Sequence, residues 1–418
     1  MEKIAQERAE DQRVLRLVMA MPDAVGRELH EMVVSAGLEV ILAMLEEERT
    51  ELCGERYRHS STRTASRAGT TRGELELGGR RVTIMRPRVR DVDKREVRLN
   101  TWEQLSNGDP LQRRAVEQMV VGVSTRKYDR SLERIDVEHR GTSKSAVSRR
   151  FVAMTEASLD KMCKADLKDF DLAVLMIDGL HIDKHVVLVA LGIDSGGNKR
   201  VLGFHEGATE NARSCKELLS NLEERGLPMD RSTLVVIDGS KALRKAINDV
   251  FGDRAIVQRC QVHKRRNVVD QLPESKKERV GMAMSQAYRS SSATTARKLL
   301  MNLARGLQAE HPSAAASLRE GLDETLTVKD FKLPAALARS LSTTNAIENI
   351  QSGIRRVCHR VTRWRGGTML LRWVGTALVE HSRGFRRMRG HAGMSRLVAV
   401  LRAKDAPTGA VAATAASA

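Results

Sequence analysis

Residues 171–182 read DLAVLMIDGLHI, and residues 233–240 read TLVVIDGS. Each stretch is a run of apolar, strand-forming residues that ends in an Asp-Gly pair, at Asp178 and at Asp238. Burying a carboxylate beside a core is costly unless it is paired or bound to a metal. A single Asp-Gly pair is commonly a turn in which the Asp caps the backbone. Two matched strand ends instead favour carboxylates that face a cation.

The segments around these two strands predict an α/β sheet. Two further strands follow the first, at residues 185–194 and 199–208. A helix at 211–227 precedes the second Asp strand, and another at 241–252 follows it. A last strand comes at 255–260. The order βββαβαβ is typical of an RNase H-like core, in which parallel strands extend three antiparallel ones. In such a sheet the first and fourth strands are neighbours, so we expect Asp178 and Asp238 to meet. Residues 170–263 are the first part of this catalytic core.

The chain after these strands reads as helical. Residues 264–341 hold no convincing strand and predict an all-helical insertion, and residues 342–404 form the second part of the core. Glu348 lies near the start of a helix in otherwise cationic sequence, which makes it the candidate third acid. A capping box with a Ser or Thr three or four residues earlier is the alternative role for this residue. Residues 405–418 are a low-complexity tail that we expect to be disordered.

The N-terminal part predicts a mainly helical DNA-binding region that contains a β-hairpin. Apolar residues recur at helical spacing within residues 1–56. Residues 57–105 then alternate between apolar and polar around Gly78-Gly79, which is a hairpin signal. The arginines of this hairpin, Arg80 and Arg81 among them, either contact DNA or blunt an exposed strand edge.

A second DNA-binding element is predicted within residues 106–165. Helical segments there resemble a helix-turn-helix, with a recognition helix over residues 143–154. Lys144, Arg149 and Arg150 would then face a groove of DNA. The alternative is an ordinary helical hairpin.

The charge of the chain is large and unevenly distributed. Its 418 residues include 71 Lys and Arg against 53 Asp and Glu, a formal net charge of +18. Residues 343–404 hold 13 basic and two acidic residues, and residues 51–100 hold 13 basic and seven acidic ones. Such concentration indicates an anionic partner, with nucleic acid first and an acidic membrane surface second. We expect five arginines after Glu348 to follow DNA that leaves the active site, namely Arg355, Arg356, Arg360, Arg363 and Arg365.

The sequence also bears on the compartment. No run reaches 18 consecutive apolar residues, so we expect no membrane span. The N-terminus mixes both charges and does not predict a secretory signal. The five scattered cysteines fit a reducing compartment better than a disulfide framework. We therefore expect a cytoplasmic, nucleoid-associated bacterial protein.

Several motifs together resemble the DDE transposases of bacterial insertion sequences in the Mutator-like family. They are Asp178, Asp238 and Glu348 in this order, RCQVHKRRNV at 259–268, STTNAIENI at 342–350 and RVTRWRGGTMLLRW at 360–373. The resemblance covers residues 170–395 strongly and 57–160 more weakly. It implies cleavage at the ends of an element followed by strand transfer into target double-stranded DNA, by a homodimer or higher oligomer.

The resemblance also implies that Cys260, His263 and Asn345 support the active site. Cys260 and His263 alone cannot complete a tetrahedral zinc site, which leaves a structural or phosphate-orienting role favoured over zinc. One departure is Gln261, where the family pattern leads us to expect an aromatic residue, usually Trp. A stacking role at this position is therefore in doubt.

Three carboxylates define the expected chemistry. Oxygen ligands of this kind suit Mg²⁺, or Mn²⁺ in its place, and can hold two ions about 3.5–4 Å apart. One alternative function is an RNase H-like nuclease or junction resolvase that cleaves DNA without strand transfer. Another is a DNA-binding regulator without catalysis, which would not require the acids.

Overall fold

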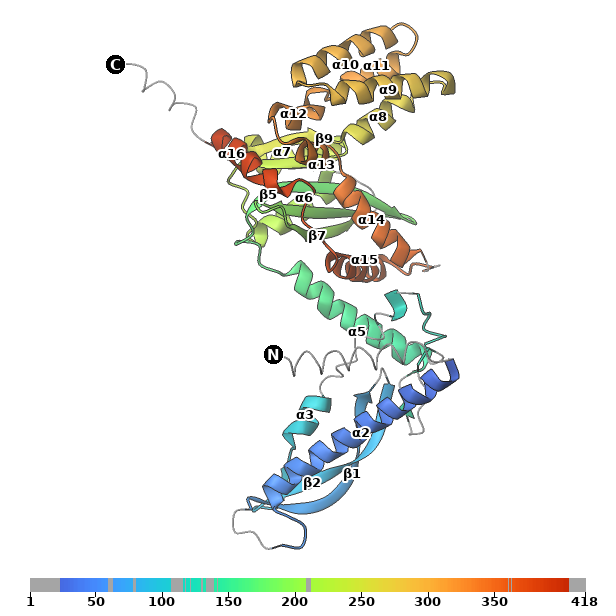
Figure 1. The fold of residues 1–418 in the computed structure, drawn as a ribbon, viewed down its shortest axis with the longest axis vertical. Coiled ribbons are helices and arrows are strands. Elements are labelled where there is room, and N and C mark those ends of the chain that lie inside the picture. The colour runs from blue at the N-terminus through green and yellow to red at the C-terminus, as the bar shows by residue number, and fades with distance from the viewer. Residues whose placement is uncertain are drawn as a thin grey trace, which may run out of the picture. The chain divides into compact units, whose positions relative to one another are not determined.

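The computed structural model divides into an N-terminal unit, residues 1–154, and a C-terminal unit, residues 155–418 (Figure 1). It describes residues 23–58, 63–77, 80–106, 142–207, 212–359, 361 and 363–405, with short stretches between 116 and 140. The predicted helix before residue 23, the turn at Gly78-Gly79 and the tail after residue 405 lie outside the described residues. No described helix has the length and apolar character needed to cross a membrane.

The N-terminal unit contains the predicted hairpin, and a long helix packs on it. Its elements are α2 (Asp23–Cys53), β1 (Ala65–Leu77), β2 (Arg80–Asp91), β3 (Glu96–Val97), α3 (Asn100–Ser106) and β4 (His139–Arg140). Strands β1 and β2 pair antiparallel, and β3 and β4 each pair with β2. Leu45 of α2 packs with Leu75 of β1 and with Val82 and Val89 of β2 to form a small core. The alternation of apolar and polar residues in the sequence is thus that of a sheet with one buried face.

The predicted recognition helix is part of a longer helix, α5 (Lys144–Cys163). The hydroxyl of Ser143 accepts a hydrogen bond from the backbone N–H of Ala146 at 3.3 Å, as expected of a residue that caps a helix N-terminus. Val147 and Phe151 are buried, as the sequence predicts for the packed side of the helix. Most of the segment that would supply the first helix of a helix-turn-helix lies outside the described residues.

The C-terminal unit is built on a five-stranded sheet. Its strands are β5 (Leu172–Ile182), β6 (His185–Asp194), β7 (Lys199–Gly207), β8 (Thr233–Ile237) and β9 (Ala255–Arg259). Their spatial order is β7-β6-β5-β8-β9; β5, β6 and β7 are antiparallel, and β8 and β9 run parallel to β5. The first and fourth strands of this unit are therefore neighbours, which confirms the predicted adjacency.

Helices cover both faces of this sheet (Figure 1). The covering helices are α6 (Ala212–Glu224) and α7 (Lys241–Phe251) on one face, and α14 (Asn345–Cys358), α15 (Gly367–Ser382) and α16 (Met394–Asp405) on the other. Side chains alternate along each strand, so Val174 and Met176 of β5 pack with α14, whereas Leu175 and Ile177 pack with α6 and α7. The long apolar runs of the sequence are explained by this burial on both faces.

An all-helical insertion separates β9 from α14, as predicted. Its helices are α8 (Gln261–Val269), α9 (Glu274–Arg289), α10 (Ala293–Leu307), α11 (Pro312–Arg319), α12 (Thr327–Asp330) and α13 (Ala335–Leu341). The first four share a core of their own, which includes Met284, Leu300 and Leu318. Buried Gln258 of β9 holds the returning segment, because its amide donates to the carbonyl of Thr325 at 2.9 Å and accepts from the N–H of Val328 at 2.8 Å.

Candidate active site

The two predicted aspartates lie on neighbouring strands. Asp238 directly follows β8, as expected, but the prediction that Asp178 ends its strand is wrong. The parallel pairing of β5 with β8 ends at Met176, yet β5 continues antiparallel to β6 as far as Ile182. Asp178 therefore lies inside a strand. It shares the face of Val174 and Met176, which is the face that α14 covers.

The carboxylate of Asp178 is in an electrostatically unfavourable position. The residue is only 7% exposed. Burial, and after it the negative charges of Asp238 and Glu348, raise its pKa to about 7, although His263 acts in the opposite direction. One oxygen accepts a hydrogen bond from the N–H of Gly179 at 3.1 Å. The negative charges of Asp178, Asp238 and Glu348 repel one another, so a cation would stabilise the site that they form.

Helix α14 supplies two residues to this site from one face. Glu348 and Gln351 are three positions apart, so they lie one above the other on the helix. The buried amide of Gln351 donates to Oδ2 of Asp178 at 2.9 Å and to the carbonyl of Gly179 at 3.3 Å. Sequence reasoning did not identify Gln351. Its spacing from Glu348 on the helix is the signal that could have done so.

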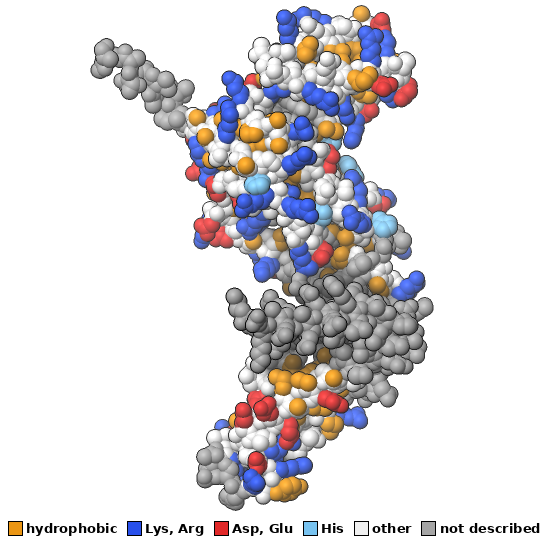
Figure 2. Space-filling view, viewed as in Figure 1, with side chains coloured by type: hydrophobic (Ala, Val, Ile, Leu, Met, Phe, Trp, Pro, Cys, Tyr) orange, Lys and Arg blue, Asp and Glu red, His pale blue; other side chains and the backbone are white. Residues whose placement is uncertain are grey.

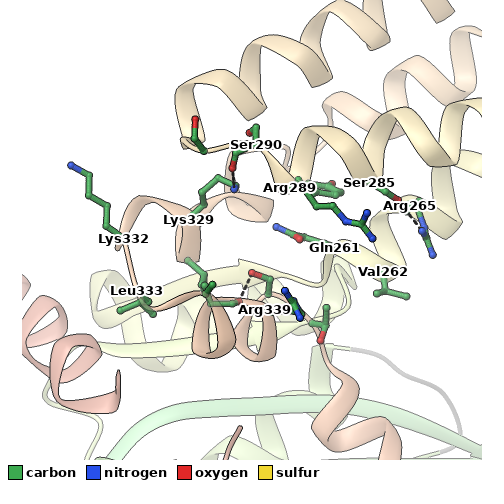
Figure 3. Close-up of a pocket in the computed structure, with 17 residues that line it drawn as sticks. Gln261, Val262, Arg265, Ser285, Arg289, Ser290, Lys329, Lys332, Leu333 and Arg339 are labelled. Carbon is green, nitrogen blue, oxygen red and sulfur yellow. Dashed lines mark hydrogen bonds between the residues drawn. The ribbon is translucent and has the colours of Figure 1, made fainter. Parts of the chain in front are cut away.

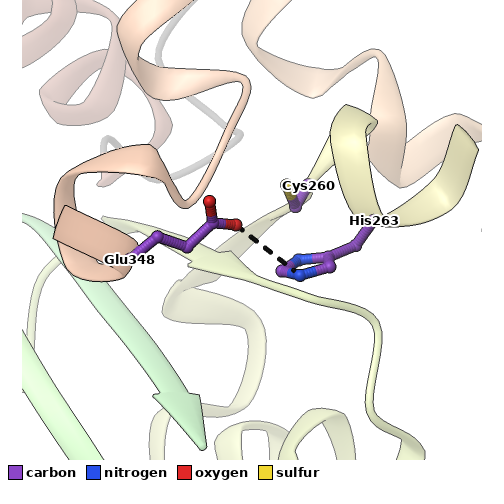
Figure 4. Close-up of side chains that lie close together, drawn as sticks. All are labelled: Cys260, His263 and Glu348. Atoms are coloured by element: carbon purple, nitrogen blue, oxygen red, sulfur yellow. Dashed lines mark ion pairs between the residues drawn. The ribbon is translucent and has the colours of Figure 1, made fainter. Parts of the chain in front are cut away.

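Glu348 contacts side chains rather than capping its helix. Its Oε1 accepts a hydrogen bond from the hydroxyl of Thr344 at 3.0 Å, and Nε2 of His263 lies 3.6 Å from the same oxygen (Figure 4). A capping box would place this carboxylate on the backbone N–H of the N-cap residue. The structure shows no such hydrogen bond for Glu348, so this residue does not act as the Glu of a capping box.

Cys260 and His263 interact with each other beside Glu348. Burial opposes ionisation of the Cys260 thiol, but hydrogen bonds from His263 and Thr344 outweigh it and lower its pKa. The bond to Cys260 raises the pKa of His263 to about 9. Ligand atoms of Cys260, His263 and Glu348 all lie within 4.8 Å of one another, which is close enough for one metal ion. Among the described residues, the ligand atoms of Asp178, Asp238 and Glu348 do not all lie this close together.

The other predicted site residues are spread over the surface. Asn345 is exposed at the first position of α14. Exposed side chains are also found at Arg81, Lys144, Arg149, Arg355, Arg356, Arg363 and Arg365, whereas Arg150 is half-buried. Figure 2 shows Lys and Arg side chains gathered on the drawn face of the C-terminal unit. Arg360 lies outside the described residues.

One predicted DNA contact is corrected by the structure. Arg80 at the start of β2 is only 2% exposed and belongs to the interior of the N-terminal unit. A guanidinium buried in this way cannot reach a phosphate. The alternating pattern of the hairpin places Arg80 on the inner face and Arg81 on the outer one.

The donor set fits hard divalent cations. Asp178, Asp238 and Glu348 offer carboxylate oxygens, which are the ligands that Mg²⁺ and Mn²⁺ prefer. Asp238 is held in place because its Oδ1 accepts from the N–H of Ser240 at 2.9 Å.

Comparison with known proteins identifies the family of this chain. Residues 9–387 match the family described as transposases of the Mutator family. The transposase of insertion sequence element IS256 in transposon Tn4001 of Staphylococcus aureus is 26% identical over 355 residues, 81% of this chain and 86% of the relative. That of IS6120 from Mycolicibacterium smegmatis is 29% identical over 240 residues, 56% and 72% of the two chains.

The transposase of element IST2 from Acidithiobacillus ferrooxidans is 32% identical over 177 residues, which cover 42% of this chain and 57% of that relative. The match to this relative thus spans little more than half of its length. The family match is far longer and includes all three carboxylates, Asp178, Asp238 and Glu348. The chain belongs to the Mutator family of transposases.

Proposed function

We propose that this protein binds the ends of an insertion sequence, cleaves DNA strands there and transfers them into target DNA. The catalytic core is an RNase H-like fold, a proposal supported by the antiparallel β5, β6 and β7 and the parallel β8 and β9. The observation that carries the chemistry is the placement of Asp178 on β5, of Asp238 directly after the neighbouring strand β8, and of Glu348 on α14, whose Gln351 bonds to Asp178. DNA is the partner that the basic surface favours.

Asp178, Asp238 and Glu348 would hold two Mg²⁺ or Mn²⁺ ions. When bound, such ions supply activation of a water or 3′-hydroxyl and stabilisation of the leaving oxygen in phosphodiester cleavage. Gln351 orients Asp178 through its amide, and Thr344 orients Glu348 through its hydroxyl. Positive His263 offsets part of the negative charge of the acids and is available to face a phosphate oxygen.

A strand-transfer assay tests this function against the main alternative. The purified protein is incubated with Mg²⁺, a supercoiled target plasmid and pre-cut DNA that carries the ends of its own element. We expect covalent joining of the 3′ ends to the target. A nuclease or junction resolvase would nick or cut DNA without joining, and this result would replace transposition by that function.

The Gln351→Leu substitution is expected to weaken the metal site. It removes a donor that favours the ionised form of Asp178, so the pKa of this carboxyl rises above about 7. Ionised Asp178 is needed to hold the metal, so protons compete with Mg²⁺ for this carboxylate, and at a fixed Mg²⁺ concentration the acid limb of the pH profile moves to higher pH. We also expect the Mg²⁺ concentration for half-maximal cleavage to rise about 10–100-fold.

The control for this test is Ser352→Ala, which changes the next residue of α14. Ser352 is exposed, and its hydroxyl donates only to the carbonyl of Glu348, one turn earlier. Its pH profile and Mg²⁺ requirement should match those of the unaltered protein. If Gln351→Leu reduced activity at all pH values equally, Gln351 would have a merely structural role.

A further inference from the structure

A hollow of about 970 Å³ opens next to the candidate active site, and the proposed chemistry does not use it. It is lined by residues of α8, α9, α12 and α13 of the insertion (Figure 3). Ser342 and Thr343, which also line it, directly precede Thr344 and the helix that carries Glu348. Whatever occupies this hollow therefore lies against the segment that positions a catalytic carboxylate.

The lining is strongly cationic. It contains Arg265, Arg289, Lys329, Lys332 and Arg339, and it includes no Asp or Glu. Within the part of the chain that the structure describes, none of these five forms an ion pair with a carboxylate. Other cations of the same insertion do so: Arg297 pairs with Asp323, and Lys276 pairs with Glu310. The positive charge of the hollow is thus left uncompensated by the protein, which favours an anionic ligand.

The cations form a row rather than one cluster. In Figure 3, Lys332 lies at one end of the hollow and Arg265 at the other, with Arg289, Lys329 and Arg339 between them. Arg265 is held by a hydrogen bond to the hydroxyl of Ser285 at 2.9 Å, and Lys329 by one to the carbonyl of Ser290 at 2.6 Å. An extended row fits a chain of phosphates better than a single phosphate.

The remaining lining suits exposed bases. Val262 and Leu333 supply apolar surface beside the cations, and Tyr288, which packs against the core of the insertion, is also among the lining residues. The hydroxyl oxygen of Thr343 is buried and has no hydrogen-bond partner among the described residues. A positively charged groove with apolar and aromatic surface is the arrangement that binds single-stranded nucleic acid. The volume is that of a ligand pocket and not of a surface that holds a duplex.

We propose that this hollow binds a single-stranded stretch of DNA next to the scissile phosphate, with the phosphates on the five cations. The inference rests on the proposed function and deepens it, because it assigns a DNA-binding role to the helical insertion. Gln261 fits this role. Its amide donates to the carbonyl of Thr325 at 2.9 Å, so this side chain shapes the wall of the hollow instead of stacking on a base.

The test compares two double variants of the full-length protein. Arg289→Ala/Arg339→Ala removes two exposed cations of the hollow, and Arg279→Ala/Lys298→Ala removes two exposed, unpaired cations of the insertion outside it. Binding of a fluorescent oligothymidine of about 15 nucleotides is measured by anisotropy, without divalent metal, at several salt concentrations. Loss of two phosphate contacts lowers the slope of log affinity against log salt concentration by about 1.4. At 0.1 M salt, this change corresponds to an affinity that is about 25-fold lower.

The outcomes separate this inference from the proposed function. If the two double variants bound the oligothymidine equally and had equal melting temperatures, the inference about the hollow would be overturned, even if the unaltered protein transfers strands. A larger loss in the hollow variant would support it even if strand transfer failed. A mononucleotide that displaces the oligothymidine at equal nucleotide concentration would show a single-phosphate site, and a loss confined to duplex DNA would assign the hollow to duplex. Either result would overturn the single-strand assignment.

Discussion

The Asp238→Asn variant is expected to lose DNA cleavage and strand transfer by about three orders of magnitude or more. Asparagine keeps the oxygen that accepts from the N–H of Ser240, so the local backbone is preserved while the charge is lost. One of three carboxylates then no longer attracts the metal, and this interaction is needed most when charge develops in the transition state. Cleavage of end-labelled DNA at saturating Mg²⁺ measures the effect.

A matched substitution separates the lost ligand from the lost charge. Asp249→Asn changes an exposed aspartate of α7 in the same unit and should leave the rate within about twofold. DNA binding by Asp238→Asn without metal should equal that of the unaltered protein. Cleavage retained by Asp238→Asn would exclude this residue from the active site.

The largest effect on stability is expected from Arg259→Met. Arg259 of β9 is 7% exposed, and its guanidinium bonds to Glu324 at 2.5 Å and lies 3.5 Å from Glu320. Removing Arg259 takes away a buried, charge-assisted hydrogen bond, but Glu324 is 25% exposed and keeps Arg244 as a partner, so the substitution costs about 2–3 kcal/mol. In a unit of this size, the melting temperature should fall by about 4–12 °C in calorimetry.

Arg244→Met is the control, because Arg244 bonds to the same Glu324 from a more exposed position. Its side chain is 32% exposed, and its Nε donates to Glu324 at 2.9 Å. Solvent screens this pair, so the substitution should cost about 1 kcal/mol or less. If the two variants melted at the same temperature, burial of Arg259 would not explain its contribution to stability.

Much of the sheet could be predicted because its strands are buried on both faces. The runs at 172–177 and 234–237 are continuously apolar, and the connecting helices show clear periodicity. The length of β5 could not be predicted in the same way. Its end is set by antiparallel pairing with β6, so Asp178 falls inside a strand that pattern alone ends at Asp-Gly.

The candidate site was predictable only where charge and apolar pattern conflict. Asp178, Asp238 and Glu348 stand out as acids in apolar or basic sequence. Gln351 does not, since before the fold places this neutral amide on Asp178 only its spacing from Glu348 on the helix marks it. Arg80 was misassigned although the alternation of the hairpin places it on the same inner face as Val82 and Ile84. Likewise, the row of cations in the insertion comes from four helices and is assembled only by their packing.

The bond between Gln351 and Asp178 joins residues 173 positions apart in the chain. During synthesis, β5 leaves the ribosome long before α14 exists. At elongation rates of about 5–20 residues per second, the interval is on the order of ten seconds or more. Once β8 has also emerged, Asp178 and Asp238 are present without the helix that completes the site. Under the proposed function, a nascent chain is therefore unable to cut DNA until its last helices have emerged and docked.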